Sequence, residues 1–340
     1  MERVMSTDAN ANEPAPTQKI KPRNFKGTRD HLPADMALRN KVFDTVAAVF
    51  ERFGFEPLQT PALEYYDVLT GKYGEDERLI YRLDYKGGFE LALRYDLTVP
   101  LARVMAQYPD LPKPFKRYQM QPVWRADRPQ VQQGRFREFW QCDADIVGTD
   151  SIRADAELVA LKWTALTELG FQQFSINVSS RKVIAALADL AGVAGKFTLM
   201  QRDGVDAEPV SVPMETIVSR GLDKLSKIGP DGVSEELTKN GVSADGIAKV
   251  LAACAITGTP VERVAAFEKL AGDSALGKAA VSEVRELIEG IASFNVPEAN
   301  VTFDIALARG LDYYTGPIFE TTVTDPPIGS LSGGGRYDEL

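Results

Sequence analysis

Residues 115–148 read "FKRYQMQPVWRADRPQVQQGRFREFWQCDADIVG", and this stretch decides the fold. Two strand-like runs, 115–127 and 135–148, flank the connecting segment 128–134. Strand-like runs that follow one another along the chain commonly pair antiparallel, so the pattern predicts a β-hairpin with a long loop. The other strand-like runs also occur in groups, with one helical block among them. The sequence therefore predicts an α+β fold on a mainly antiparallel sheet flanked by helices.

Hydrophobic spacing predicts the elements around this hairpin. Residues 34–53 carry apolar side chains at helical intervals, and Gly54 stands where a glycine ends a helix. Residues 55–64 are expected to be extended, because their two prolines exclude a helix. Residues 89–106 predict a strand, a break near Pro100 and a short helix. Further predicted elements are a helix over 151–169 and strands over 174–180, 301–308 and 316–324.

Composition divides the chain into four parts. Residues 1–20 are polar, lack the apolar stretch of a signal peptide and contain acidic residues, so a disordered tail is expected. Residues 21–180 and 297–340 hold the strand-like runs and are expected to form two parts of one catalytic domain. Between them, 181–296 is rich in small residues and helical in pattern, which predicts a helical insertion. The chain ends inside an apparent motif, as expected of a fragment of a longer protein.

The overall composition excludes several classes of protein. The chain has 340 residues, 44% of them hydrophobic and 26% charged, which is typical of a globular domain with a large core. A net charge of −9 argues against non-specific coating of nucleic acid. Cys142 and Cys254 lie far apart without ligand spacing, so no zinc site or disulfide is predicted, and a cytoplasmic location fits. No bilayer-spanning run, Rossmann glycine motif or P-loop is found in the sequence.

One face of the second hairpin strand is polar. By the two-residue period of a strand, Arg137, Phe139, Gln141, Asp143 and Asp145 point the same way. Such a mixture of arginine, ring, amide and carboxylates is no core pattern. It predicts either a solvated sheet face, which would leave Phe139 exposed, or a binding site.

Arginines surround the hairpin. Arg125 closes the first strand, Arg128 lies in the loop, and Arg135 opens the second run. A guanidinium presents a planar fork that matches phosphate oxygens, and a ring such as Phe139 can stack on a base. Together these residues predict a site for a nucleoside triphosphate that needs no P-loop.

Two further segments end in polar side chains. If its strand stays regular, Arg309 continues a buried row and needs an anionic partner. A structural ion pair with Asp304 or Asp312 explains it, and so does a place in a binding site. Asp96 and Thr98 share one face of their predicted strand and suit an ammonium group. A turn before the following proline is the alternative for these two residues.

These stretches give the chain a family resemblance. The matching segments are "FKGTRDHLP" (25–33), "GFEPLQTPALE" (54–64), "LRYDLTVPLAR" (93–103), "VWRADRPQVQQGRFREFWQCDADIVG" (123–148), "ARGLDYYTGPIFE" (308–320) and "GGGRYDEL" (333–340). In this order the chain resembles the class II aminoacyl-tRNA synthetases, and among them the histidyl-tRNA synthetase family. The segments span nearly all of 21–340, and "RGLDYYTG" (309–316) is close to a signature of the histidyl branch.

The resemblance implies roles for individual residues. It implies ATP contacts from Arg125, Asp127, Arg135, Phe139 and Arg309, with Arg125 and Arg309 as the catalytic pair on the α-phosphate. It implies histidine contacts from Asp96, Thr98, Arg125, Gln141, Asp145, Arg309, Tyr313 and Tyr314. Of these, Asp145 and Tyr314 would read the imidazole, while Asp96, Thr98 and Gln141 would hold the α-amino and carboxylate end. The glycines of 333–335 match residues that line the same pocket. Asp96 and Asp145 stand where some members carry glutamate.

The resemblance also implies substrates and partners. These are ATP with Mg²⁺, L-histidine and tRNA(His), with no tightly bound metal, in a homodimer formed through "GFEPLQTP" (54–61). The chain ends before the family's motif 3 and its anticodon-binding domain, and the helical insertion would lie near the acceptor arm. The rival interpretation is a regulatory subunit of ATP phosphoribosyltransferase, which resembles the same domain without aminoacylation. The retention of both Arg125 and Arg309 favours the synthetase.

Overall fold

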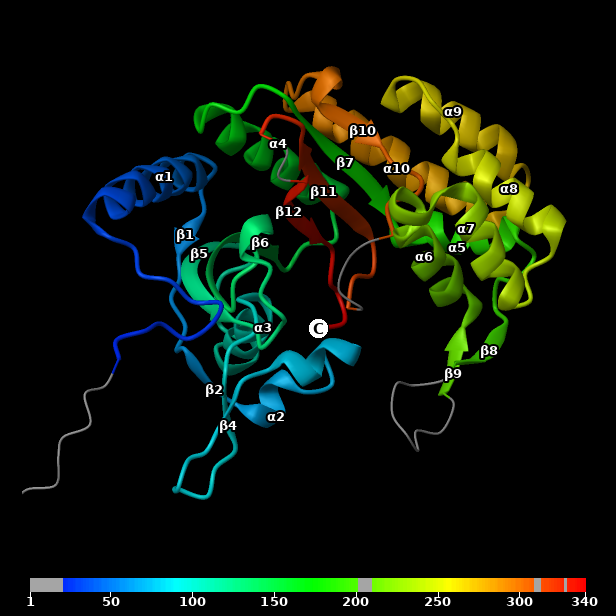
Figure 1. Cartoon of the computed structure of the whole chain (residues 1–340). Helices are drawn as coiled ribbons and strands as arrows, with labels where there is room; N and C mark the ends of the chain where they lie inside the picture. Colours follow the sequence, from blue (N-terminus) through cyan, green and yellow to red (C-terminus); the bar gives the residue numbers. More distant parts are fainter. Residues whose placement is uncertain (1–20, 201–209, 309–312, 327–328) are drawn as a thin grey trace, which may run out of the picture.

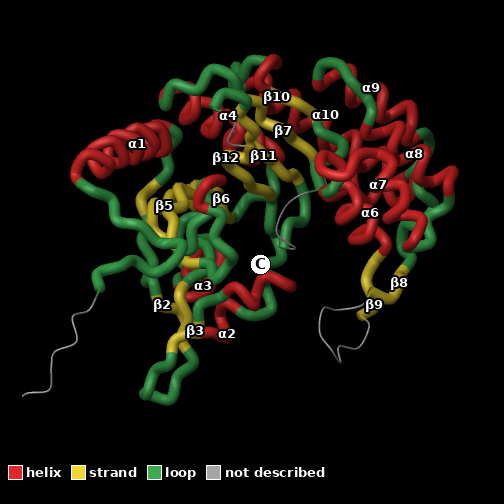
Figure 2. The backbone as a smooth tube through the Cα atoms, in the orientation of Figure 1, coloured by secondary structure: helices red, strands yellow, loops and turns green. Residues whose placement is uncertain are grey.

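The computed structural model of the chain describes residues 21–200, 210–308, 313–326 and 329–340. Two β-sheets lie next to each other in the middle of the molecule, with helix α1 (Pro33–Arg52) beside the first and a group of helices beyond the second (Figure 1). Figure 2 shows the same division, with strands between two sets of helices. This is the α+β arrangement that the sequence predicts. The expected N-terminal tail lies outside the described residues.

The first sheet contains the predicted hairpin. Its strand order is β1 (Glu56–Pro57), β5 (Phe115–Trp124) and β6 (Glu138–Val147). β5 and β6 pair antiparallel along their whole lengths, and β1 lies parallel to β5. The connection between the two long strands holds a single short turn, η2 (Val131–Gln133). The hairpin with a long loop is therefore confirmed.

The second sheet has the order β10–β7–β11–β12. Its strands are β10 (Val301–Phe303), β7 (Phe174–Ser180), β11 (Pro317–Val323) and β12 (Gly329–Gly335). β10 is parallel to β7, whereas β11 is antiparallel to both of its neighbours. The strands expected over 174–180 and 316–324 are confirmed. The glycines of 333–335 belong to β12, a strand that the sequence did not predict.

The strand expected over 301–308 was predicted too long. β10 stops at Phe303, because the side chain of Asp304 accepts a hydrogen bond from the backbone N–H of Ala306 at 3.0 Å. The backbone N–H of Leu307 also donates to the carbonyl oxygen of Asp304, at 3.1 Å, which closes a turn. The regular row that would have continued to Arg309 therefore ends six residues earlier, and Arg309 itself lies outside the described residues.

The remaining strands form two smaller sheets. β2 (Leu63–Tyr65), β4 (Leu91–Leu93) and β3 (Arg82–Leu83) form one sheet in that order, while β8 (Phe197–Met200) and β9 (Val210–Pro213) form a separate hairpin. β4 confirms the strand expected within 89–106. The break expected near Pro100 was wrong, because helix α3 (Thr98–Gln107) begins before it. A proline is tolerated in the first turn of a helix, where its missing N–H removes no intrahelical bond.

The helix predicted over 151–169 is α4 (Ile152–Glu168), and the remaining helices were not individually predicted. They are α2 (Tyr66–Leu69), α5 (Arg181–Leu190), α6 (Met214–Asp223), α7 (Leu225–Lys239), α8 (Ala244–Cys254), α9 (Pro260–Ala271) and α10 (Ala275–Ser293), with short turns η1 (Gly74–Leu79) and η3 (Glu298–Asn300). α1 has a proline in its first turn and is followed by Gly54 at φ +78°, the left-handed geometry expected of a C-terminal glycine. Among the described residues, no helix is both long and apolar enough to cross a bilayer.

The cores lie on the helix side of each sheet. Val49 and Phe50 of α1 pack with Leu161 of α4 against Tyr118 of β5. Leu287 and Ile291 of α10 join α4 and cover the second sheet in the same way. Burying side chains of this size stabilises the fold by about 1.5–3 kcal/mol each. Because helices cover one face of the β5–β6 hairpin, its other face remains for a site.

Candidate active site

The face of the hairpin turned away from α1 and α4 is polar along nearly its whole length. The side chains that face each other across the two strands are Arg117 and Asp145, Gln119 and Asp143, Gln121 and Gln141, and Val123 and Phe139. Arg117 and Gln119 are fully buried. The polar face expected on the second strand is therefore confirmed. On that strand Asp145 is buried, and Phe139, Gln141 and Asp143 are half-buried.

Several buried polar atoms on this face lack a partner. Among the described residues, no hydrogen-bond partner within the protein is found for Arg117 Nε and Nη1, Gln119 Oε1 and Gln141 Oε1. Leaving such groups unpaired away from water costs about 1–3 kcal/mol each, so native structures satisfy nearly all of them. Their concentration on one face indicates a place where a polar ligand or ordered water completes the hydrogen bonding.

A buried ion pair forms the end of this face nearest the second sheet. Arg117 Nη2 lies 2.7 Å from Asp145 Oδ2 and donates to the carbonyl oxygen of Leu97 at 3.2 Å. The phenol of Tyr337 donates a hydrogen bond to the other carboxylate oxygen, Asp145 Oδ1. The carboxylate of Asp145 is thus held from both sides, by a guanidinium and by a hydroxyl.

Three tyrosine rings line the space beside Asp145. The ring centroids of Tyr313 and Tyr314 are 5.1 Å apart, and those of Tyr313 and Tyr337 are 6.1 Å apart. Burial, and then the charge of Asp145, raise the pKa of the Tyr314 phenol, which stays protonated as a donor. A Cβ on Gly335 would come within 2.9 Å of the Tyr314 ring, so this position needs glycine.

A second buried carboxylate, Asp96, lies at the other end of the tyrosine row. Its Oδ1 accepts hydrogen bonds from the Tyr73 phenol at 3.0 Å and from the backbone N–H groups of Thr98 and Val99 at 3.1 and 3.0 Å. Tyr313 donates to Asp96 Oδ2 at 3.4 Å. Burial raises the pKa of Asp96, whereas these hydrogen bonds oppose that rise.

The prediction that Asp96 and Thr98 share a strand face was wrong. Asp96 follows β4 and Thr98 is the first residue of α3, so the two are joined through a turn. Carboxylates commonly accept backbone N–H groups at a helix start in this way. The structure thus shows the turn that was the alternative for these residues: Oδ1 holds the helix start, while Oδ2 accepts from Tyr313.

Arg125 lies next to Asp96 in a sandwich of rings. Its guanidinium carbon is 4.3 Å from the ring centroid of Tyr95 and 5.1 Å from that of Phe139. Nε donates to the carbonyl oxygen of Tyr95 at 3.2 Å. The guanidinium is therefore fixed in orientation while its terminal nitrogens donate no hydrogen bond to another described residue, a geometry suited to an anionic oxygen.

The loop residues are arranged around Arg137. The backbone carbonyl of Asp127 accepts from Arg137 Nε at 2.9 Å, and the Arg137 backbone N–H donates to Gly27 at 2.8 Å. Arg135 pairs through its backbone with Gln130 and is exposed. The structure thus groups Arg125, Phe139, Gln141, Asp145, Asp96, Tyr313 and Tyr314 in one region, while the side chain of Arg135 stays outside it.

Three contributing residues escaped the sequence prediction. Arg117 continues the same alternation as Arg125, Val123 and Gln121, so extending that row by two more positions would have found it. Tyr337 follows a glycine-rich strand that carries no hydrophobic signal. Tyr73 lies in an irregular segment, where no periodicity indicates a buried hydroxyl.

Within the described ranges, no group of three or more histidine, cysteine, aspartate or glutamate side chains could hold a metal ion. The side chains that the structure places at this site are fixed cations, carboxylates and phenols. Such a set can hold a zwitterion and orient a phosphate, and it contains no nucleophile poised beside a base.

Comparison with known proteins identifies the family. A model of the histidyl-tRNA synthetase family matches residues 27–207 and 226–340. A histidine–tRNA ligase from Gloeobacter violaceus is 41% identical over 339 residues, which covers 92% of this chain and 68% of the relative. One from Clostridium tetani is 41% identical over 326 residues and covers 94% and 69%.

Solved structures are similar to this chain as well. The histidyl-tRNA synthetase of Nostoc sp. PCC 7120 superposes with a TM-score of 0.81 at 31% identity, covering 95% of this chain and 70% of that one. A structure from Bacillus halodurans, titled as an ATP phosphoribosyltransferase regulatory subunit/histidyl-tRNA synthetase, gives 0.76 at 24% identity, covering 97% and 78%, and shows the fold alone. The fold is that of a class II aminoacyl-tRNA synthetase. Within that class, the chain belongs to the histidyl-tRNA synthetase family.

Asp143 gives the site a pH-dependent stability. Burial raises the pKa of its carboxyl to about 7. The charges around it are Arg117, Arg125 and Lys162, which oppose the rise, and Asp145 and Asp96, which add to it. The unfolded carboxyl titrates near about 3.9, so between about pH 4 and pH 7 the folded state binds a proton that the unfolded state does not.

We therefore expect the contribution of Asp143 to the free energy of unfolding to fall as pH rises through that window. Asp143→Asn, which imitates the neutral acid, should flatten this slope. Urea unfolding of both proteins across the window measures it. Parallel pH dependences in the two proteins would contradict the raised pKa of Asp143.

Proposed function

We propose that the chain activates L-histidine with ATP, forming histidyl-adenylate and pyrophosphate, and then transfers histidine to the 3′ end of tRNA(His). The observation that carries this proposal is the pair of buried carboxylates, Asp96 and Asp145, joined by one row of tyrosines. A free amino acid with a hydrogen-bonding side chain needs such a pair: one carboxylate for its ammonium group and one partner for its side chain.

We assign recognition of the imidazole to the end of the site that holds Asp145. A neutral imidazole has one N–H donor and one acceptor nitrogen. The Asp145 carboxylate, fixed by Arg117 and Tyr337, accepts the N–H, and the phenol of Tyr314 donates to the other nitrogen. A site of buried hydrogen-bonding groups rejects side chains that cannot pair with them by factors of about 10⁴–10⁵.

The histidine carboxylate and the α-phosphate of ATP, which react with each other, then lie near Arg125. An oxygen of the histidine carboxylate attacks the α-phosphorus of ATP, the bond to the β-phosphate oxygen breaks, and pyrophosphate leaves. Arg125 stabilises charge on the α-phosphate, with Arg309 assigned the same task by the family pattern. Phe139 offers a ring to the adenine, Asp127 borders it, and Mg²⁺ arrives with the triphosphate.

The second step consumes the adenylate. A terminal hydroxyl of tRNA attacks the histidyl carbonyl, forming the ester and releasing AMP. We assign the helical block 181–296 to the neighbourhood of the tRNA acceptor arm, as the family pattern implies. The competing proposal, a regulatory subunit of ATP phosphoribosyltransferase, draws on the fold likeness to the Bacillus halodurans structure and requires no such chemistry.

Histidine-dependent exchange of pyrophosphate into ATP separates the two proposals. Using the full-length gene product, we expect exchange, and expect Arg125→Ala to lower its rate by about 10²–10³, the effect of removing one preorganised charge donor. Arg309→Ala should do the same with the fold intact. Arg52→Ala is the control, because it removes only an exposed ion pair between Arg52 of α1 and Glu168 of α4, and it should leave exchange unchanged. Tight histidine binding without exchange would favour the regulatory subunit.

Tyr337→Phe tests the imidazole assignment. The substitution keeps the ring and removes the hydroxyl that orients Asp145, a charge-assisted hydrogen bond whose loss is equivalent to about tenfold in affinity. The KM for histidine in exchange should rise by about that factor while the KM for ATP stays unchanged. Tyr108→Phe, at an exposed tyrosine, is the matched control. A histidine KM unaffected by Tyr337→Phe would argue that Asp145 does not read the side chain.

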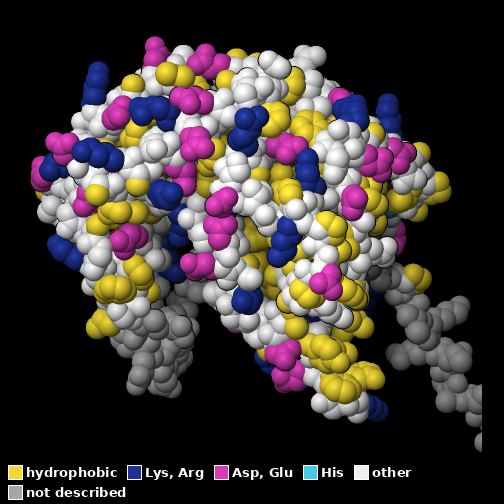
Figure 3. Space-filling view, turned by 180° about the vertical axis from the view of Figure 1, so that it is seen from behind, with side chains coloured by type: hydrophobic (Ala, Val, Ile, Leu, Met, Phe, Trp, Pro, Cys, Tyr) yellow, Lys and Arg dark blue, Asp and Glu magenta, His cyan; other side chains and the backbone are white. Residues whose placement is uncertain are grey.

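We also propose a homodimer formed through 54–61 and the surface beside it. Leu63, Tyr65, Tyr85 and Phe89 are exposed around β2–β4, and the apolar side chains at the lower end of the face in Figure 3 mark this region. Exposed apolar patches of this kind commonly become protein interfaces. Sedimentation at micromolar concentration should show a dimer that Tyr65→Glu together with Phe89→Glu converts to a monomer. A monomeric parent protein would refute the assignment.

A further inference from the structure

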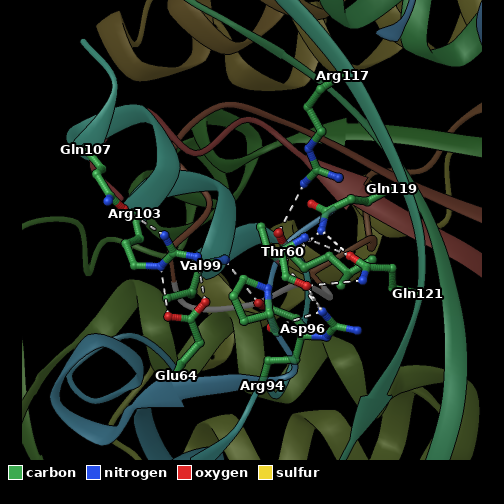
Figure 4. Close-up of polar contacts among 12 residues, drawn as sticks. Thr60, Glu64, Arg94, Asp96, Val99, Arg103, Gln107, Arg117, Gln119 and Gln121 are labelled. Carbon is green, nitrogen blue, oxygen red and sulfur yellow. Dashed lines mark hydrogen bonds and ion pairs between the residues drawn. The ribbon is translucent and has the colours of Figure 1, made fainter. Parts of the chain in front are cut away.

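Arg94 is a buried cation held by backbone carbonyl groups. It follows β4 directly and is 1% exposed. Its Nε and Nη2 both donate to the carbonyl oxygen of Pro122, at 2.9 and 2.8 Å, and its Nη1 donates to those of Thr60 and Pro61, at 2.7 and 3.1 Å (Figure 4). Burial lowers the pKa of Arg94, and the nearby charge of Glu64 opposes this. A single guanidinium therefore joins β5 to the segment after β1.

The backbone of Arg94 makes the same two connections. Its N–H donates to the carbonyl oxygen of Ala62 at 3.0 Å, and its own carbonyl oxygen accepts the N–H of Trp124 at 3.2 Å. Both the side chain and the backbone of one residue thus reach the 60–62 segment on one side. On the other side they hold Pro122 and Trp124, the residues that lead directly into Arg125.

This arrangement fixes both ends of the proposed site. Arg125 follows Trp124, and its Nε donates to the carbonyl of Tyr95, the residue after Arg94. Asp96 comes one residue later. A shift of Arg94 relative to β5 would therefore move the carboxylate assigned to the substrate ammonium away from the guanidinium assigned to the α-phosphate.

Neighbouring glutamines reinforce the connection to Thr60. The backbone N–H of Thr60 donates to Gln121 Oε1 at 3.1 Å, and Gln121 Nε2 donates to the Thr60 carbonyl oxygen at 3.2 Å. Gln119 Nε2 donates to the Thr60 hydroxyl at 2.9 Å and to Gln121 Oε1 at 2.7 Å. The segment that carries Thr60 is thus tied into the polar network of β5, as Figure 4 shows.

Only arginine suits this position. Its planar fork of five donors can serve three carbonyl groups on two sides at once, whereas the compact ammonium of lysine cannot span them. We propose that Arg94 is a positioning residue for adenylate formation, which sets the distance between Arg125 and Asp96 by tying β4, β5 and the 60–62 segment together. The inference rests on the proposed function and deepens it.

The test is Arg94→Lys, assayed by histidine-dependent pyrophosphate exchange and corrected for the folded fraction. Misplacement of reacting groups by about 1 Å can cost about 10²-fold in rate, so we expect kcat at saturating histidine and ATP to fall about tenfold or more. A residue that only supported the fold would lower the unfolding midpoint and leave kcat per folded molecule unchanged.

Arg103→Lys is the matched control. Arg103 holds Glu64 through two hydrogen bonds of 2.8 Å in the same region, but among the described residues it donates none to β5 or the 60–62 segment. Its exchange kinetics should be unchanged, and an equal loss of kcat there would overturn the inference.

If Arg94→Lys does not fold, Gln121→Met loosens Thr60 from β5 by another route. It should also lower kcat, and an unchanged value would overturn the inference.

The same exchange assay distinguishes a failure of the proposed function from a failure of the inference about Arg94. Absence of exchange in the unsubstituted protein overturns the proposed function and this inference with it. Normal exchange in the unsubstituted protein, together with an unchanged kcat in Arg94→Lys, overturns the inference alone.

Discussion

The antiparallel register of β5 with β6 is the constraint on which the site depends. Because side chains alternate along a strand, this register places Arg117 opposite Asp145 on one face and leaves Tyr118 for the apolar core on the other. A slip by one residue would turn the charged row into the helices and the core residues into the site. The burial of Tyr118 between α1 and α4 is therefore also what turns the polar side chains toward the candidate site.

The charges on the polar face are retained at a cost in stability. Removing two ions from water offsets much of their mutual attraction, so a buried pair such as Arg117–Asp145 is a poor source of stability. Arg94 adds a buried cation that relies on carbonyl oxygens, and Asp96 adds a carboxylate that relies on hydroxyl and N–H donors. Each ion is held by groups from different elements. The fold thus fixes these charges in advance, and preorganised charge of this kind is how sites lower a barrier.

The sequence predicted several of the longer elements and the polar face of the hairpin. Period-two alternation found the hairpin and its polar face, and helical spacing found α1 and α4. It failed where side chains bond to nearby backbone, because such bonds compete with the regular pattern. Asp304 ends β10 in this way, although buried Ile305 and Leu307 continue the alternation, and Asp96 turns the chain into α3.

Other parts of the site left no local signal. β12 is largely glycine, so it carries no hydrophobic pattern, and Tyr337 beyond it meets Asp145 only through the tertiary fold. The partners of Arg94 are carbonyl groups, which every residue possesses. A buried arginine next to a strand is visible in a sequence, but its partners become visible only when the segments are placed together.

The most direct measurement is a crystal structure of the protein with L-histidine and a non-hydrolysable ATP analogue. We expect the imidazole to lie against Asp145 and Tyr314 and the α-ammonium group against Asp96. We expect the α-phosphate to lie within hydrogen-bonding distance of Arg125. Histidine bound with its imidazole at Asp96, or away from the β5–β6 face altogether, would contradict it.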